Sequence, residues 1–207
     1  PWDVTILSGG ALGIDGEAHL AALKNGLPTQ AWLVGPLLDP SPQFHRLLFD
    51  RMLRTPGCGH IVPECVEPTA EKPVRKKDWL ERNQWLAAAA DALVVVEAQK
   101  PSGTWSTVKA AHDYGVPIHL LPGPINSPQS EGINAMIADN CGNPITSVQQ
   151  LVESLVGSLR ARYNESRNPE LSPGPGGVST DHAKRPLDLS LLETLRQRLN
   201  QPAGLDL

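Results

Sequence analysis

Residues 4–15 read VTILSGGALGID: an apolar run, a turn of small residues, and the first residues of a periodic stretch. The run Val4–Leu7 predicts a short β-strand. Alanines at positions 18, 21 and 22 have helical spacing, so we expect a helix over Asp15–Asn25 that ends at Gly26. A strand that passes through a glycine turn into a helix predicts the first unit of a parallel α/β sheet.

The same alternation continues along the chain. The run Ala92–Val96 is uninterruptedly apolar, which predicts a central parallel strand that is buried on both faces. Repeated strand–helix units favour a mostly parallel sheet with helices on both faces. We expect further strands at Gln30–Val34, Ile61–Val62 and Pro117–Leu121, and helices at Ser41–Leu53, Asp78–Ala90, Thr104–Tyr114, Ile133–Asp139 and Val148–Arg162.

The composition changes near the C-terminal end. Residues 164–186 are rich in Ser, Pro, Gly and charge and include SPGPGG, which predicts a flexible linker. Leucines at positions 189, 192, 195 and 199 then have helical spacing. We therefore expect one α/β domain over residues 1–163, the linker over 164–186, and part of a small helical module over 187–207.

Charge and cysteine content limit the possible functions. The 207 residues carry 18 Lys and Arg against 22 Asp and Glu, a net charge of −4, which excludes a uniformly basic nucleic-acid surface but allows a local patch. No apolar stretch approaches the roughly 20 residues of a membrane span. Three cysteines cannot all pair, so we expect a reducing, cytoplasmic location. Cys58, His60 and Cys65 match no standard zinc spacing, and we expect no metal.

Three loops follow predicted strands, at the sheet edge where parallel α/β folds bind ligands. Ser8–Gly13 is similar to G-x-G-x-x-G with serine first; it either approaches an anion closely or forms a tight turn without ligand. Pro101–Thr104 offers hydroxyls that cap the next helix or bind phosphate. The third loop follows the strand predicted at Pro117–Leu121. In it we expect Ser130 to cap the helix at Ile133, and Asn134 to make a polar contact.

A segment of mixed charge lies between the first and second loops. Its cations form either a solvated surface or a phosphate-binding patch in which Trp79 and Trp85 are stacking platforms. Helical spacing favours Leu80, Trp85 and Leu86 as core residues instead. No Walker lysine loop, HExxH or G-x-S-x-G motif is present, so we expect no catalysis. The five cations are Lys72, Arg75, Lys76, Lys77 and Arg82.

Six short motifs occur together in one order. They are SGGALGID at residues 8–15, RN at 82–83, ADALVVVEA at 90–98, SGT at 102–104, LPG at 121–123, and S-x-G-x-N at 130–134. In this order and spacing they resemble the DprA/Smf family of DNA-processing, or recombination-mediator, proteins. The resemblance covers about residues 4–140.

The resemblance implies an extended Rossmann-like fold with a winged-helix-like C-terminal module. It also implies a non-enzymatic protein without cofactor that binds single-stranded DNA, dimerises through the Rossmann domain, and loads a RecA-type recombinase during natural transformation in competence. We expect contacts to DNA phosphates from Ser8, Gly9, Gly10, Gly13, Lys72, Arg75, Lys76, Lys77, Arg82, Asn83, Ser102, Gly103, Thr104, Gly123, Ser130 and Asn134.

The chain departs from the family pattern in several places. Members usually begin with an earlier strand and helix, which are absent here. Leu12 replaces an arginine, and Glu81 and Gln84 stand where basic residues usually flank the RN pair. These losses keep an alternative open: a nucleotide-binding sensor or nucleoside-phosphate-processing protein on the same fold, with Glu97 as its acid. A protein-interaction module with a vestigial pocket is a third possibility.

Overall fold

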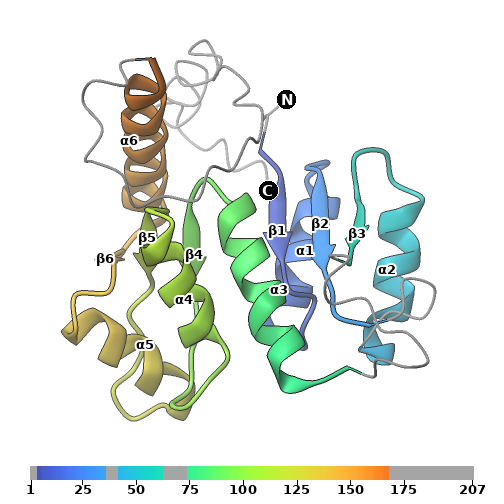
Figure 1. The fold of residues 1–207 in the computed structure, drawn as a ribbon, viewed down its shortest axis with the longest axis horizontal. Helices are drawn as coiled ribbons and strands as arrows, with labels where there is room; N and C mark the ends of the chain where they lie inside the picture. The colour runs from blue at the N-terminus through green and yellow to red at the C-terminus, as the bar shows by residue number, and fades with distance from the viewer. Residues whose placement is uncertain (1–3, 36–41, 63–73, 168–207) are drawn as a thin grey trace, which may run out of the picture. The chain divides into compact units, whose positions relative to one another are not determined.

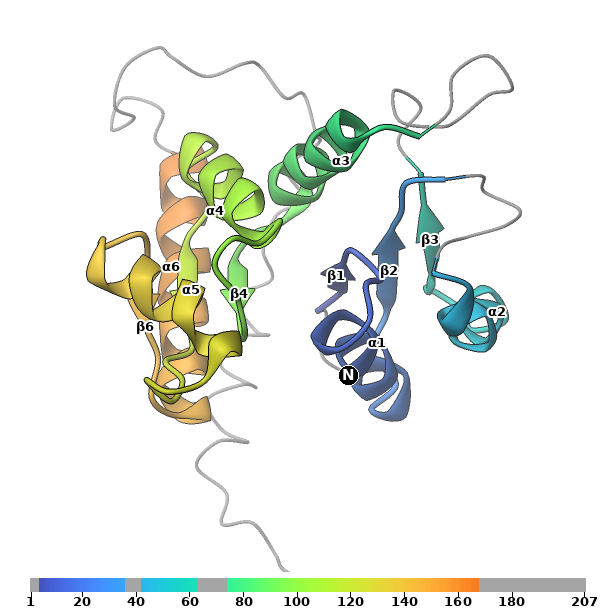
Figure 2. The same cartoon turned by 90° about the horizontal axis from the view of Figure 1, so that it is seen from below.

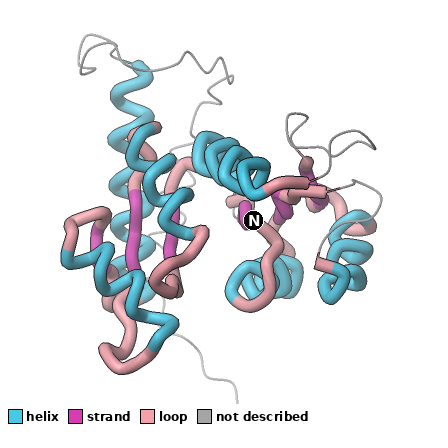
Figure 3. Tube along the Cα trace, turned by 60° about the horizontal axis from the view of Figure 1, so that its bottom comes forward, coloured by secondary structure: helices cyan, strands magenta, loops and turns pink. Residues whose placement is uncertain are grey.

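The computed structural model describes residues 4–35, 42–62 and 74–167. The chain divides into two compact units, residues 1–144 and 145–207. Strands and helices alternate through the first unit, as Figure 3 shows. The second unit contains α6 (Val148–Arg167), which continues five residues beyond the predicted end at Arg162. The predicted module at 187–207, and all of the predicted linker beyond Arg167, lie outside the described residues.

The first sheet contains three short parallel strands, β1 (Ile6–Ser8), β2 (Thr29–Trp32) and β3 (Gly59–Ile61), in the order β1-β2-β3. Helices α1 (Ile14–Lys24) and α2 (Arg46–Leu53) pack against these strands, as can be followed in Figure 1. The predicted helix over 41–53 is in fact a 3-10 turn at Gln43–His45 followed by α2; Ser41 lies outside the described residues.

The second sheet is also parallel, with the order β4-β5-β6. Its strands are β4 (Leu93–Val95), β5 (Ile118–Leu120) and β6 (Asn143–Pro144), and α4 (Thr104–Asp113) and α5 (Pro128–Ala138) pack against it. Helix α3 (Lys76–Ala89) connects the two sheets in sequence and packs against α4 (Figure 2). The predicted parallel α/β architecture is therefore confirmed.

Two local predictions were wrong. The run 92–96 is not a central strand: β4 pairs with β5 on one side only among the described residues, and Val94 is 37% exposed. Helix α5 begins at Pro128 after Ser127, so Ser130 cannot cap it and instead lies buried in its first turn. Proline is favoured in a first helical turn because its φ is already helical, which places the start of α5 before Gly132.

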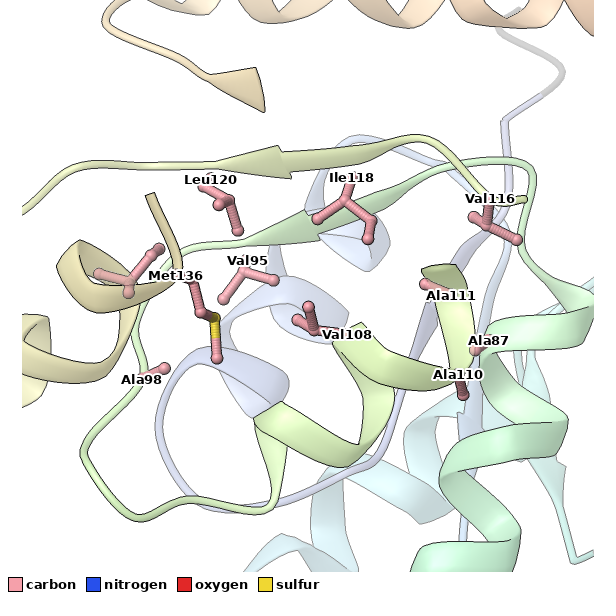
Figure 4. Packing of buried hydrophobic residues seen from close by; sticks show 11 residues of the cluster. Ala87, Val95, Ala98, Val108, Ala110, Ala111, Val116, Ile118, Leu120 and Met136 are labelled. Carbon is pink, nitrogen blue, oxygen red and sulfur yellow. The ribbon is translucent and has the colours of Figure 1, made fainter. Parts of the chain in front are cut away.

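Apolar side chains form a separate core on each sheet. Ala31, Leu33, Leu48, Phe49 and Met52 pack together on the first sheet. The larger core lies on the second sheet and includes residues from α3, α4, β5 and α5, as Figure 4 shows. Ala87 of α3 belongs to this cluster, so α3 is tied to the second sheet by apolar packing. Burial of each Val, Leu, Ile, Phe or Met side chain in these cores contributes roughly 1.5–3 kcal/mol, and burial of an alanine contributes less.

Replacing Leu120 tests this core. Its side chain is fully buried in the second cluster, so Leu120→Ala should lower the free energy of unfolding by about 2–5 kcal/mol through lost burial and a residual cavity. The control is Leu53→Ala, because Leu53 is 58% exposed and should change stability by less than about 0.5 kcal/mol. Urea titration of the two variants measures both values, and equal effects would contradict the assignment of the core.

Helix α1 carries a buried histidine toward β2. The Thr29 hydroxyl donates to the Ile6 carbonyl over 3.0 Å, so the 2.7 Å contact between His19 Nδ1 and Thr29 Oγ1 is a hydrogen bond donated by the ring. His19 is completely buried, and its pKa is lowered from 6.5 to about 4, chiefly by burial; Asp15 opposes this shift, and His45 adds to it by a smaller amount. His19 is therefore neutral in the folded protein at physiological pH.

This histidine makes stability depend on pH. The unfolded chain takes up a proton near pH 6.5, whereas folded His19 does so only near pH 4, so acidification favours the unfolded state between these values. The expected loss from this group is about 3 kcal/mol between pH 7 and pH 4, with no further loss below that range. Urea titrations across this range should give a smaller loss for His19→Gln than for the original chain. Identical pH profiles would contradict the prediction.

Candidate functional site

The glycine turn after β1 lies against the core of the first sheet. Gly10 and Gly13 have φ values of +70° and +91°, which side-chain-bearing residues rarely adopt. A Cβ at Gly10 would also lie 2.7 Å from Leu33 Cδ2 and 3.2 Å from the Phe49 ring, so glycine is required there by space as well. The turn thus has one fixed conformation at the start of α1.

Side chains from α1, from the 3-10 turn at Gln43–His45 and from α3 hydrogen-bond to this turn. Asp15 of α1 accepts a 3.1 Å hydrogen bond from the Ala11 N–H, and His45 donates from Nδ1 to the Gly10 carbonyl over 3.1 Å. The N–H groups of Gly10, Leu12 and Gly13 donate no hydrogen bond to another described residue. Unpaired N–H groups at the start of a helix attract anions, since the helix dipole is positive at this end.

Arg82 of α3 is buried beside the same turn, with 7% of its surface exposed. Its Nη1 donates to the Gly9 carbonyl over 2.8 Å and also to the Trp32 carbonyl. Burial lowers the pKa of the guanidinium, while the Asp15 carboxylate favours the charged form. The guanidinium carbon lies 5.4 Å from the centre of the Trp79 ring, within cation–π range. The structure thus gives Arg82 backbone carbonyls as partners, where the sequence predicted a phosphate.

Asn83, the next residue, reaches the loop after β4. Its Nδ2 donates to Ser106 Oγ over 2.8 Å, and Ser106 Oγ in turn donates to the Gly103 carbonyl over 2.7 Å. Within this SGT loop the hydroxyl of Ser102 is buried and has no partner among the described residues. The RN pair therefore contacts the loops that follow β1 and β4 through adjacent residues of one helix.

The third loop is held by α5. Asn134 accepts a hydrogen bond from the Gly123 N–H over 3.2 Å and donates to the Gly123 carbonyl over 3.0 Å, so the predicted polar contact of Asn134 is confirmed. Ser130 is buried against Gly123, where a Cβ would lie 2.0 Å from its Oγ. Gly132 donates to the Ala98 carbonyl over 2.8 Å, so α5 also contacts the loop after β4.

Apart from the buried Arg82, the described cations of the basic segment lie on the surface. Arg75, Lys76 and Lys77 are exposed at the start of α3, where the Arg75 N–H donates to Asp78 Oδ2 over 2.7 Å. Trp79 is 38% exposed. Leu80 and Trp85 are 42% and 45% exposed and Leu86 is half-buried, so the prediction that Leu80 and Trp85 join the core was wrong. Lys72 lies outside the described residues, as does Cys65.

His45 was not predicted as part of the site. His45 reaches a carbonyl 35 positions earlier in the chain, and no local pattern indicates such a contact. Within the described part of the chain, no group of three or more His, Cys, Asp or Glu residues could hold a metal ion, and Cys58 and Cys141 are free thiols. None of the described helices is long and apolar enough to cross a membrane.

Two solved structures resemble this fold. DNA processing protein A from Streptococcus pneumoniae matches 72% of the chain with a TM-score of 0.61 and 29% identity, and the match covers 50% of that protein. DNA processing protein A from Helicobacter pylori, described in terms of its single-stranded DNA binding mode, matches 74% of the chain with a TM-score of 0.63 and 24% identity, over 66% of its own length. At that identity the second match supports the fold alone.

Sequence comparison agrees with the structural likeness. Protein Smf of Escherichia coli is 32% identical over 85% of the chain, and DNA processing protein DprA of Streptococcus pneumoniae is 32% identical over 72% of it. The chain spans about half the length of these two relatives, 46% and 51%. The model of the DNA recombination-mediator protein A family matches residues 1–156, three quarters of the sequence. The chain therefore belongs to the DprA/Smf family of DNA recombination-mediator proteins.

Proposed function

We propose that this protein binds single-stranded DNA as a non-enzymatic recombination mediator in the cytoplasm. The observation that carries the proposal is the glycine turn, in which the N–H groups of Gly10, Leu12 and Gly13 lack described partners at the start of α1. Such a site binds phosphate oxygens without reading bases, which suits single strands of any sequence.

Exposed cations on α3 would extend the phosphate contacts. Arg82 binds the turn, and Lys76 precedes Arg82 by about 9 Å along the helix, because the rise is about 1.5 Å per residue. A strand bound at the turn could therefore reach Lys76 as well. Trp79 and Trp85 each expose part of a ring on the same helix, and exposed aromatic rings stack on unpaired bases. Backbone N–H groups would thus be the fixed contacts and lysines the adaptable ones.

The glycines and hydroxyls of the other two loops complete the proposed phosphate path. Asn83 and Asn134 would act by holding these loops, since their amides bind loop residues of the same chain. The proposed members in these loops are Ser102, Gly103, Thr104, Gly123 and Ser130. Loading of a RecA-type recombinase and dimerisation through the Rossmann domain belong to the same proposal, on the strength of family membership.

Removal of two surface cations tests the DNA contact. Each phosphate contact on a single strand contributes about 0.7 to the slope of log affinity against log salt. The double variant Lys76→Ala/Lys77→Ala should therefore bind oligo-dT more weakly and lose about 1.4 from that slope. Fluorescence anisotropy at several salt concentrations measures both quantities.

Lys109→Ala is the matched control, because Lys109 is an exposed lysine of α4 that pairs with Asp113 over 2.8 Å. It should leave the slope unchanged. Absence of oligo-dT binding by the original chain at low salt would contradict the proposed function. Thermal stabilisation by a mononucleotide in that case would favour the nucleotide-binding alternative.

Restoring a cation in the turn gives a second test. Leu12 is 62% exposed and stands where the family usually has arginine, so Leu12→Arg should tighten oligo-dT binding and add about 0.7 to the salt slope. Leu47→Arg adds the same charge on α2, at an 84% exposed position outside the turn, and should leave the slope nearly unchanged. Equal effects of both variants would indicate nonspecific attraction and contradict a site at the turn.

A further inference from the structure

Arg82 is a cation in a proposed DNA-binding site, yet it is buried and bound to the protein's own backbone. We propose that Arg82 is a positioning residue: it fixes the glycine turn for DNA and does not itself neutralise a phosphate. This inference rests on the proposed function, and it assigns Arg82 a different role from Arg75, Lys76 and Lys77, which are exposed.

The first argument is the identity of its partners. The two carbonyls that Nη1 binds belong to Gly9, directly after β1, and to Trp32, the last residue of β2. These are the carboxyl ends of two adjacent parallel strands, the edge at which this class of fold binds ligands. Unpaired carbonyl oxygens at that edge would repel a phosphate. A guanidinium that occupies them removes this repulsion and leaves the N–H groups of the turn available.

The second argument is the space at Gly9. A Cβ at this position would lie 2.5 Å from Arg82 Nη1 and 3.0 Å from Asp15 Oδ2. Gly9 therefore lacks a side chain where Arg82 and Asp15 approach the turn. Asp15 also accepts from the Ala11 N–H, so one carboxylate and one guanidinium hold adjacent parts of the turn.

The two roles predict different salt behaviour. An arginine that binds phosphate displaces a counterion, so its removal lowers the salt slope by about 0.7 for a single strand. An arginine that binds carbonyls of the same protein displaces none, so its removal lowers affinity at every salt concentration without a change in slope. Lysine cannot replace it fully, since an ammonium lacks the planar fork of a guanidinium.

The experiment measures oligo-dT affinity of the full 207-residue chain across a salt series. Arg82→Lys, Arg82→Ala and Gly9→Ala should each weaken binding about tenfold or more at an unchanged slope. Arg75→Ala should lower the slope by about 0.7 and serves as the phosphate-binding control. Amide hydrogen exchange of Leu12 and Gly13 should be faster in the Arg82 and Gly9 variants but not in Arg75→Ala.

The remaining outcomes overturn either the positioning role of Arg82 alone or the proposed function together with it. A slope lowered by about 0.7 in Arg82→Ala, or full affinity in Arg82→Lys, would overturn the positioning role while the proposed function stands. Failure of the original chain to bind oligo-dT would overturn both. If Arg82→Ala does not fold, Gly9→Ala and Arg82→Lys still carry the test, because each disturbs the same contact by a smaller change.

Discussion

The arrangement of the site depends on two adjacent side chains of α3 that bind backbone groups in opposite halves of the first unit. Arg82 donates hydrogen bonds to carbonyls at the strand ends of the first sheet. Asn83 donates to the start of α4, which packs against the second sheet. Successive residues of a helix point about 100° apart, so one helix placed between two loops can serve both. Unpaired buried polar groups are costly, and the contacts of Arg82 give the Gly9 and Trp32 carbonyls a hydrogen-bond donor.

Glycines make these approaches possible. Gly9 leaves space for the guanidinium, and Gly132 allows α5 to approach the loop after β4, where a Cβ would lie 2.4 Å from the Gln99 carbonyl. At both positions the absence of a side chain lets another part of the protein come close enough to hydrogen-bond to the glycine backbone. The glycines of the family motifs therefore have a packing role in this chain that does not require any ligand.

Local sequence patterns were sufficient to predict the helices and strands, but not which strands and side chains contact one another. The strand near Val4, the helix after it and the strand–helix alternation follow from apolar spacing alone. The exposure of Val94 could not be predicted, because burial depends on which strands lie beside β4 and not on its own residues. The contact of Arg82 with Gly9 spans 73 positions, so its side chain could be recognised as basic from the sequence but not as buried.

The family resemblance and the structure together explain which motif residues differ in this chain. Of the three positions at which the resemblance implies a cation, Leu12 and Gln84 are exposed and Glu81 is half-buried. Arg82 and Asn83, which match the pattern, are buried. A surface cation can be exchanged at small cost in stability, but removal of a buried one leaves carbonyls unsatisfied. The net charge of −4 is therefore a poor guide to the proposed DNA binding, since N–H groups held in place by buried residues add nothing to net charge.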